Sequence, residues 1–127
     1  LTDKNLLTKL YKYPQLIDYA NSKTDIVTLC QFIETVAENF KAGIYNAVHS
    51  NALTTREVVK ILKEYGIENK DWKFVPYEIL KLKAHRSNCV LSNQKALDDF
   101  GFDFGDEELI IRLNASIIGR TLKWEKK

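Results

Sequence analysis

Two tyrosine–lysine pairs have the spacing of a proton-transfer pair. Lys23 follows Tyr19 after three residues, and Lys81 follows Tyr77 in the same way. A lysine can lower the pKa of a nearby tyrosine, which then exchanges a proton with a substrate oxygen, provided one helix face carries both side chains. Tyr19 and Lys23 precede the helix that we expect from about residue 25. We therefore interpret Tyr19 as structural and Lys23 as solvated, with a catalytic pair as the alternative.

Other chemistry finds little support in the residue pattern. The five glycines do not form the closely spaced set that brings a backbone against a pyrophosphate, and there is no phosphate-binding P-loop. His49 and His85 lie far apart without carboxylates at ligand spacing, so we expect no metal site. No serine or cysteine has the context of a nucleophile elbow. We accordingly assign no catalytic residue and no cofactor-binding residue to this chain.

Composition indicates one ordinary globular domain of 127 residues, with a formal net charge of +2. The basic residues are scattered, so we expect no nucleic-acid partner. No apolar run is long enough for a membrane span, and the first residues do not resemble a signal peptide; we therefore expect a cytoplasmic protein. Cys30 and Cys89 lack paired spacing and are interpreted as buried, reduced thiols.

Helical periodicity is clearest in two places near the start of the chain. Residues 4–13 place leucines at helical spacing, and Pro14 ends that helix. A longer helix is expected over about residues 25–40, with Thr24 or Asp25 as its cap. Its apolar stripe comprises Ile26, Leu29, Ile33, Val36 and Phe40.

The later part of the chain alternates helices with short strands. Thr54 and Glu57 form a capping box for a helix that Gly66 closes. Ser92 caps a short helix that ends at Gly101, and a final helix starts near residue 106. Short strands are expected at residues 15–19, 44–49, 72–77 and 89–91. This is an α/β organisation with too few strands for an independent doubly wound sheet, and it suits a piece that completes a larger one.

Four blocks of sequence follow one another in a recognisable order and spacing. They are residues 5–10 with Tyr13, residues 21–24, residues 43–46 with Leu53, Thr54 and Glu57, and residues 86–97 ending at Gly101. The fourth is the most specific. In this order the chain resembles the C-terminal region of the extended short-chain dehydrogenase family, closest to dTDP-4-dehydrorhamnose reductase and UDP-4-keto-6-deoxyglucose 3,5-epimerase/4-reductase.

The resemblance implies a division of labour within a larger enzyme. It implies that residues 1–127 are the nucleotide-sugar-binding C-terminal domain of a Rossmann-type fold whose cofactor-binding half is absent here. NADPH or NADH and the catalytic tyrosine and lysine belong to that missing N-terminal cofactor domain. The chain is therefore not catalytic alone, and the implied partner is a UDP- or dTDP-linked sugar.

The same resemblance selects three substrate-binding candidates: Arg86, Asn88 and Asn5. The guanidinium of Arg86 offers forked, permanently charged donors to a phosphate or a ribose. Asn88 either binds substrate or holds its loop, and Asn5 either lies near the sugar nucleotide or caps the first helix.

Other functions remain open at this stage. The chain is alternatively a non-catalytic regulatory or scaffold relative of the family, a classical short-chain dehydrogenase fragment that uses Tyr19 and Lys23, or a helical interaction module. The sequence does not decide whether it forms a homo-oligomer.

Overall fold

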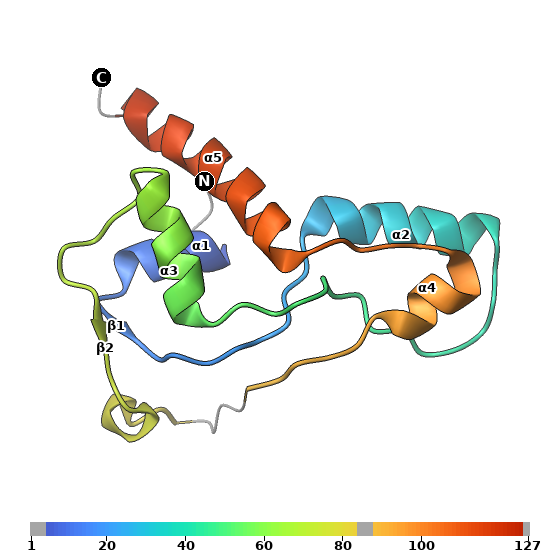
Figure 1. Ribbon diagram of the computed structural model, residues 1–127, viewed down its shortest axis with the longest axis horizontal. Helices are drawn as coiled ribbons and strands as arrows, with labels where there is room; N and C mark the ends of the chain where they lie inside the picture. Colours follow the sequence, from blue (N-terminus) through green and yellow to red (C-terminus); the bar gives the residue numbers. More distant parts are fainter. Residues whose placement is uncertain (1–4, 84–87, 126–127) are drawn as a thin grey trace.

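In the computed structural model, which describes residues 5–83 and 88–125, two groups of helices are joined by long irregular segments (Figure 1). The first group contains α1 (Leu6–Lys12), α3 (Thr55–Glu64) and α5 (Glu107–Glu125). The second group contains α2 (Ile26–Glu38) and α4 (Gln94–Phe100). The chain is thus mostly helical, and α5 runs from the junction between the groups to the carboxyl end.

The described residues form one sheet, of two short parallel strands. β1 (Gln15–Leu16) pairs with β2 (Lys73–Phe74), and Gln15 lies opposite Lys73. A 3-10 helix, Tyr77–Leu80, follows β2. The expected strands at 15–19 and 72–77 are confirmed only as these short segments. The sheet is too small to form a layer, so the fold rests on helix packing.

The main core lies where α3 packs on α5. Thr54 and Glu57 form the expected capping box at the start of α3. Buried aliphatic side chains from α1, α3, α5 and the segments on either side of α3 then build one cluster: Leu7, Leu53, Val58, Ile61, Leu62, Ile67, Ile111, Ala115 and Ile118. A β-carbon added at Gly119 would lie 2.7 Å from the carbonyl oxygen of Tyr65, so a glycine is needed where α5 passes the C-terminal end of α3.

A smaller core of aromatic residues holds the second group together. Phe32 of α2 is buried against Ala96 and Phe104, and rings from the neighbouring loops surround it. The hydroxyl of Tyr45 donates a 2.7 Å hydrogen bond to Asp99, and this bond raises the pKa of Tyr45. Gly101 ends α4 in the left-handed conformation, as the sequence predicts.

The expected strands at 44–49 and 89–91 are not formed within the described residues. A strand needs a neighbour, because its backbone groups are paired across the sheet. Residues 44–48 do have the alternating exposure of a strand, but no neighbouring strand lies beside them. The α/β prediction therefore fails in its strand content. The predicted helices are confirmed, with bounds within a few residues of those predicted. The last helix starts at Glu107, next to the predicted residue 106, and continues to Glu125.

The structure also bears on the two cysteines and on the expectation of no membrane span. Cys30 and Cys89 are both exposed, so the prediction of two buried thiols is wrong. Among the described helices, none has the length and apolar character to cross a membrane.

Candidate functional site

Two adjoining hollows lie beside α1, and they share Leu6 and Lys23 as lining residues. The larger has a volume of about 500 Å³ and lies between α1, the start of α2 and the first turns of α5. The smaller, of about 270 Å³, lies between α1, residues 19–23 and α3. Together they form a continuous candidate site, which we call the α1 cleft.

Lys23 separates the two hollows and is fixed by three acceptors. Its Nζ donates to the carbonyl oxygens of Asn21 (2.8 Å) and Leu53 (3.1 Å) and to Glu107 Oε2 (2.9 Å). Glu107 is fully buried, and its Oε2 also accepts the Leu53 amide at 2.6 Å. Its other oxygen, Oε1, is buried without a hydrogen-bond partner among the described residues. The floor of the cleft therefore contains a lysine paired with a buried carboxylate, one oxygen of which accepts no hydrogen bond from the described residues.

A second polar group lines the larger hollow at the start of α2. The Asp25 amide donates to His49 Nε2 (3.1 Å), and His49 Nδ1 lies 2.7 Å from the carbonyl oxygen of Phe104. The Asp25 carboxylate accepts from Thr28 and Asn114. Burial acts to raise the pKa of Asp25, but the hydrogen bonds from Thr28 and Asn114 outweigh it and lower that pKa. These contacts order the helix start and satisfy a buried histidine.

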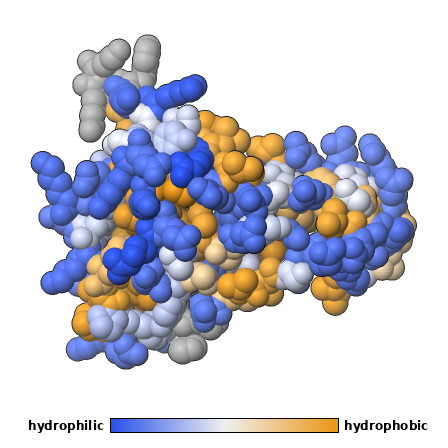
Figure 2. Space-filling model, viewed as in Figure 1, coloured by the Kyte–Doolittle hydropathy of each residue, from blue (hydrophilic) through white to orange (hydrophobic). Residues whose placement is uncertain are grey.

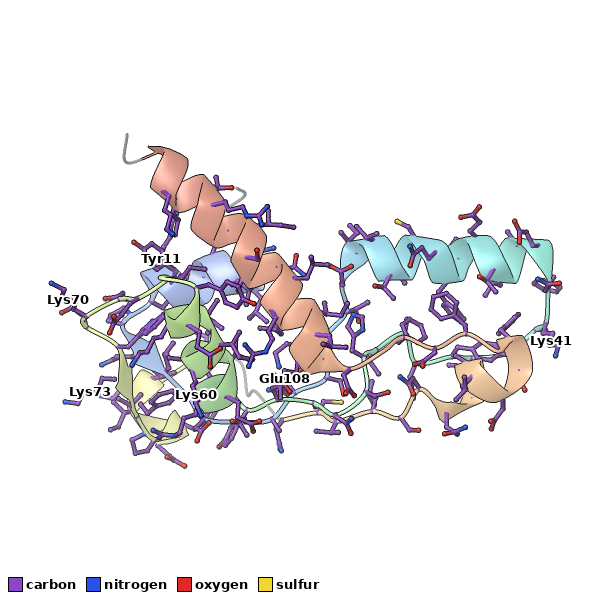
Figure 3. All side chains as sticks on the ribbon, turned by 45° about the horizontal axis from the view of Figure 1, so that its top comes forward. Tyr11, Lys41, Lys60, Lys70, Lys73 and Glu108 are labelled. Atoms are coloured by element: carbon purple, nitrogen blue, oxygen red, sulfur yellow. The ribbon has the colours of Figure 1, made fainter. Side chains whose placement is uncertain are left out.

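Apolar walls complete the larger hollow. They come from Leu6 and Leu7 of α1, Ile26 of α2, and Ile110 and Ile111 of α5. A mainly apolar hollow with a few fixed polar atoms is the usual form of a small-molecule site. Glu108, which Figure 3 labels, marks the beginning of α5 at the junction of the two groups.

Asn5 lines the larger hollow and also caps α1. Its Oδ1 accepts the amides of Leu7 (2.9 Å) and Thr8 (3.5 Å). Its side-chain nitrogen donates to no acceptor among the described residues, so it remains available to a ligand. The two alternatives raised for Asn5 are thus compatible with each other.

Asn88 is exposed, and its side chain makes no hydrogen bond within residues 5–83 and 88–125. Its segment is held by other residues: Asn21 accepts the Cys89 amide (2.6 Å), and Ser22 Oγ accepts the Leu91 amide (2.8 Å). Since Asn21 and Ser22 line the smaller hollow, Asn88 belongs to a segment that flanks it. Arg86 lies outside the described residues.

The catalytic alternative for Tyr19 and Lys23 fails. Tyr19 lies outside any helix and stacks on Tyr77, with ring centroids 6.5 Å apart. Lys23 is committed to three acceptors and is neither helical nor solvated. Tyr77 and Lys81 do not share an α-helix either, because Lys81 ends the 3-10 helix in a left-handed conformation.

Sequence reasoning missed Glu107 as a site residue and predicted only that a helix starts near residue 106. Its partners Lys23 and Leu53 lie 84 and 54 positions away along the chain, so no local pattern connects them. The described residues contain no cluster of three or more histidine, cysteine or acidic side chains that would hold a metal ion.

Comparison with known proteins supports the resemblance found in the sequence. The chain is 28% identical over 99 residues to the bifunctional dTDP-4-dehydrorhamnose 3,5-epimerase/dTDP-4-dehydrorhamnose reductase of Arabidopsis thaliana, a match covering 76% of this chain and 33% of that protein. Its fold matches the crystal structure of a UDP-rhamnose synthase from Acanthamoeba polyphaga mimivirus with a TM-score of 0.80 and 23% identity. That match covers 91% of this chain and 41% of the solved one. No family model matches.

The fold and the sequence together make this chain a relative of the extended short-chain dehydrogenases. It is distantly homologous to dTDP-4-dehydrorhamnose reductase and to the mimivirus UDP-rhamnose synthase over most of its length. The chain spans about a third of the first relative and about two-fifths of the second.

Proposed function

We propose that residues 1–127 are the substrate-binding portion of an NAD(P)-dependent nucleotide-sugar reductase or epimerase. The substrate is a UDP- or dTDP-linked 4-keto-6-deoxy sugar, and the α1 cleft binds it. The carrying observation is that a chain homologous to rhamnose-forming enzymes places Asn5 and the 88–91 segment at the edges of a two-part cleft.

The two hollows have complementary roles in this proposal. The sugar lies against the apolar walls of the larger hollow, and the side-chain amide of Asn5 donates to one of its oxygens. The nucleotide lies in the smaller hollow, beside Asn88. Arg86 neutralises the diphosphate, because a guanidinium forms charge-assisted bonds to phosphate oxygens.

This chain does not fit the dinucleotide cofactor. Its five glycines never form the fingerprint that lets a backbone approach a pyrophosphate, and within residues 5–83 and 88–125 neither pair with the required spacing, Tyr19–Lys23 or Tyr77–Lys81, lies on one α-helix. Hydride and proton transfer therefore require a second, cofactor-binding part. The residues of this chain bind and orient the sugar for that part.

Nucleotide titration tests the proposal. We expect UDP or dTDP to bind weakly and to shift the backbone NMR signals of residues 5–8, 21–23 and 88–91. We expect no detectable stoichiometric binding of NADPH. An Arg86→Gln variant should bind UDP about ten- to a hundredfold more weakly, since it loses a charge-assisted contact.

Arg120→Gln is the matched control, because Arg120 is an exposed arginine of α5 that lines neither hollow of the α1 cleft. It should bind UDP as the wild type does. Stoichiometric NADPH binding, or UDP shifts confined to residues outside the α1 cleft, would contradict the proposal.

A further inference from the structure

The lining of the larger hollow contains more negative than positive charge. Its charged residues are Lys23, Asp25 and Glu107, one lysine against two carboxylates. Lys23 lies 2.9 Å from Glu107, so this pair is neutral and the carboxylate of Asp25 is left over. His49 does not compensate it, because its Nε2 accepts the Asp25 amide and its Nδ1 donates to Phe104, as in a neutral ring. A phosphate is therefore disfavoured in this hollow.

The smaller hollow has the opposite balance. Lys23 is the one charged residue among the described residues that line it. This difference between the hollows favours one orientation of a nucleotide sugar, with the diphosphate toward the smaller hollow and the uncharged sugar in the larger one. Recognition of the sugar then depends on uncharged polar groups of the larger hollow.

Asn114 of α5 contributes such a group. Its Nδ2 donates to Asp25 Oδ1 (3.2 Å) and to the carbonyl oxygen of Ile110 (2.9 Å). Because both of these neighbours are acceptors, the side-chain nitrogen must face them, which fixes the position of Oδ1. Asn114 lines the larger hollow, and its Oδ1 accepts no hydrogen bond from the described residues.

Solvent reaches this oxygen. Within residues 5–83 and 88–125, the buried side-chain oxygens without a hydrogen-bond partner are Thr8 Oγ1 and Glu107 Oε1, and Asn114 Oδ1 is not one of them. It differs in this respect from Glu107 Oε1, which is enclosed. Asn114 thus presents an acceptor that is both fixed by its neighbours and accessible to a ligand.

The surroundings of Asn114 make this acceptor selective. The hollow is mainly apolar, with Ile26, Ile110 and Ile111 among its walls. Figure 2 shows hydrophobic side chains reaching the surface beside α5, near the start of α2. A ligand that covers a fixed acceptor in such a place without donating to it leaves the acceptor unpaired, and this costs binding free energy.

We propose that Asn114 is a specificity-determining residue of the α1 cleft, and that its Oδ1 accepts a hydrogen bond from a sugar hydroxyl. This inference rests on the proposed function and deepens it. Asn5 donates from α1 and Asn114 accepts on α5, so two positions of the sugar are recognised at once. A keto oxygen has no hydrogen to donate. In a 4-keto-6-deoxy sugar the hydroxyl that Asn114 recognises is therefore the one at C2 or C3.

Titration of UDP and UDP-glucose into the wild type and Asn114→Ala tests the proposal. Alanine is a good helix former, and circular dichroism checks the fold of the variant. UDP-glucose should bind the wild type more tightly than UDP does. The substitution should weaken UDP-glucose about three- to tenfold, since one neutral hydrogen bond is lost, and change the UDP affinity less than about twofold. A purely structural role, through Asp25, would weaken both ligands alike.

Analogues of UDP-glucose that lack the hydroxyl at C2 or at C3 complete a cycle with the substitution. For one of them, the wild type and Asn114→Ala should bind equally well. Thr121→Ala is the matched control. Thr121 donates to the carbonyl oxygen four residues earlier on α5, as Asn114 does, but it lines neither hollow, so its loss should change no affinity.

Equal weakening of UDP and UDP-glucose by Asn114→Ala, or a loss that persists with both deoxy analogues, would overturn the role of Asn114. UDP-glucose that binds the wild type no more tightly than UDP would also overturn it, while nucleotide binding by the cleft would stand. If neither ligand binds the wild type, the proposed function fails and this inference fails with it.

Discussion

Glu107 is the residue at which distant parts of the chain converge. It holds Lys23 and the Leu53 amide, and the adjacent Asp106 accepts from Asn51. The Lys23 side chain is 17% exposed and Glu107 is fully buried, so this ion pair is shielded from water. Removing one partner of such a pair leaves an uncompensated charge, which costs far more than losing a surface pair.

We therefore predict that Glu107→Gln lowers the free energy of unfolding by about 3 kcal/mol, because Lys23 loses its counter-charge. Urea unfolding followed by circular dichroism measures the change. Glu108→Gln is the control: Glu108 pairs with Arg112 at the surface, and its loss should cost less than about 1 kcal/mol. Equal stability of Glu107→Gln and wild type would show that the ion pair contributes nothing net.

The Asp25 carboxylate makes the free energy of unfolding depend on pH in the acid range. Its pKa is lowered in the folded chain, so its contribution is present above the unfolded value of about 4 and is lost as pH falls through the lower, folded value. Asp25→Asn retains an equally good helix cap but cannot titrate. We expect its urea midpoint to fall less than that of the wild type below pH about 4. Parallel pH profiles of the two proteins would contradict this role.

At the scale of elements, the contact between α3 and α5 depends on one missing side chain. An alanine β-carbon at position 119 would meet the Tyr65 carbonyl at 2.7 Å, and backbone cannot move aside cheaply. We predict that Gly119→Ala destabilises the chain by about 1–3 kcal/mol. Thermal unfolding measures it, with Arg120→Ala as an exposed neighbour on the same helix. A stabilised Gly119→Ala variant, as expected for an ordinary helical glycine, would show that the helices adjust freely.

Local chemistry made several element ends predictable from the sequence. The cap at Thr54, the stop at Gly101 and the cap at Asn5 each depend on residues within a few positions of one another. The strand expected at 44–49 was not predictable in the same way, because a strand also needs a neighbour that the pattern of one segment cannot supply. The same holds for the site. Asn5 was predicted from its local context, whereas the Lys23–Glu107 ion pair was not, because its two residues lie 84 positions apart in the sequence.

At the scale of the whole molecule, the two groups of helices are unequally stabilised. The core between α3 and α5 contains nine buried apolar residues, whereas the core around Phe32 contains three. Figure 3 shows Lys41 at the far end of the second group, away from α5. Regions with few buried apolar contacts open more readily than regions with many.

We therefore predict that α2 and α4 exchange their amide hydrogens through a lower-energy opening than α3 and α5. Native-state hydrogen exchange measures both groups in one experiment. Phe32→Ala, which removes the centre of the smaller core, should cost about 3 kcal/mol locally and speed exchange in α2 and α4 while leaving α3 slow. Ile111→Ala, in the larger core, is the counterpart and should speed exchange in α3 and α5, while α2 and α4 keep the rate set by their own lower-energy opening. If Phe32→Ala speeds exchange equally in α3, the chain unfolds as one unit. Faster exchange in α2 and α4 alone would instead show that the second group opens while the α3–α5 core stays closed.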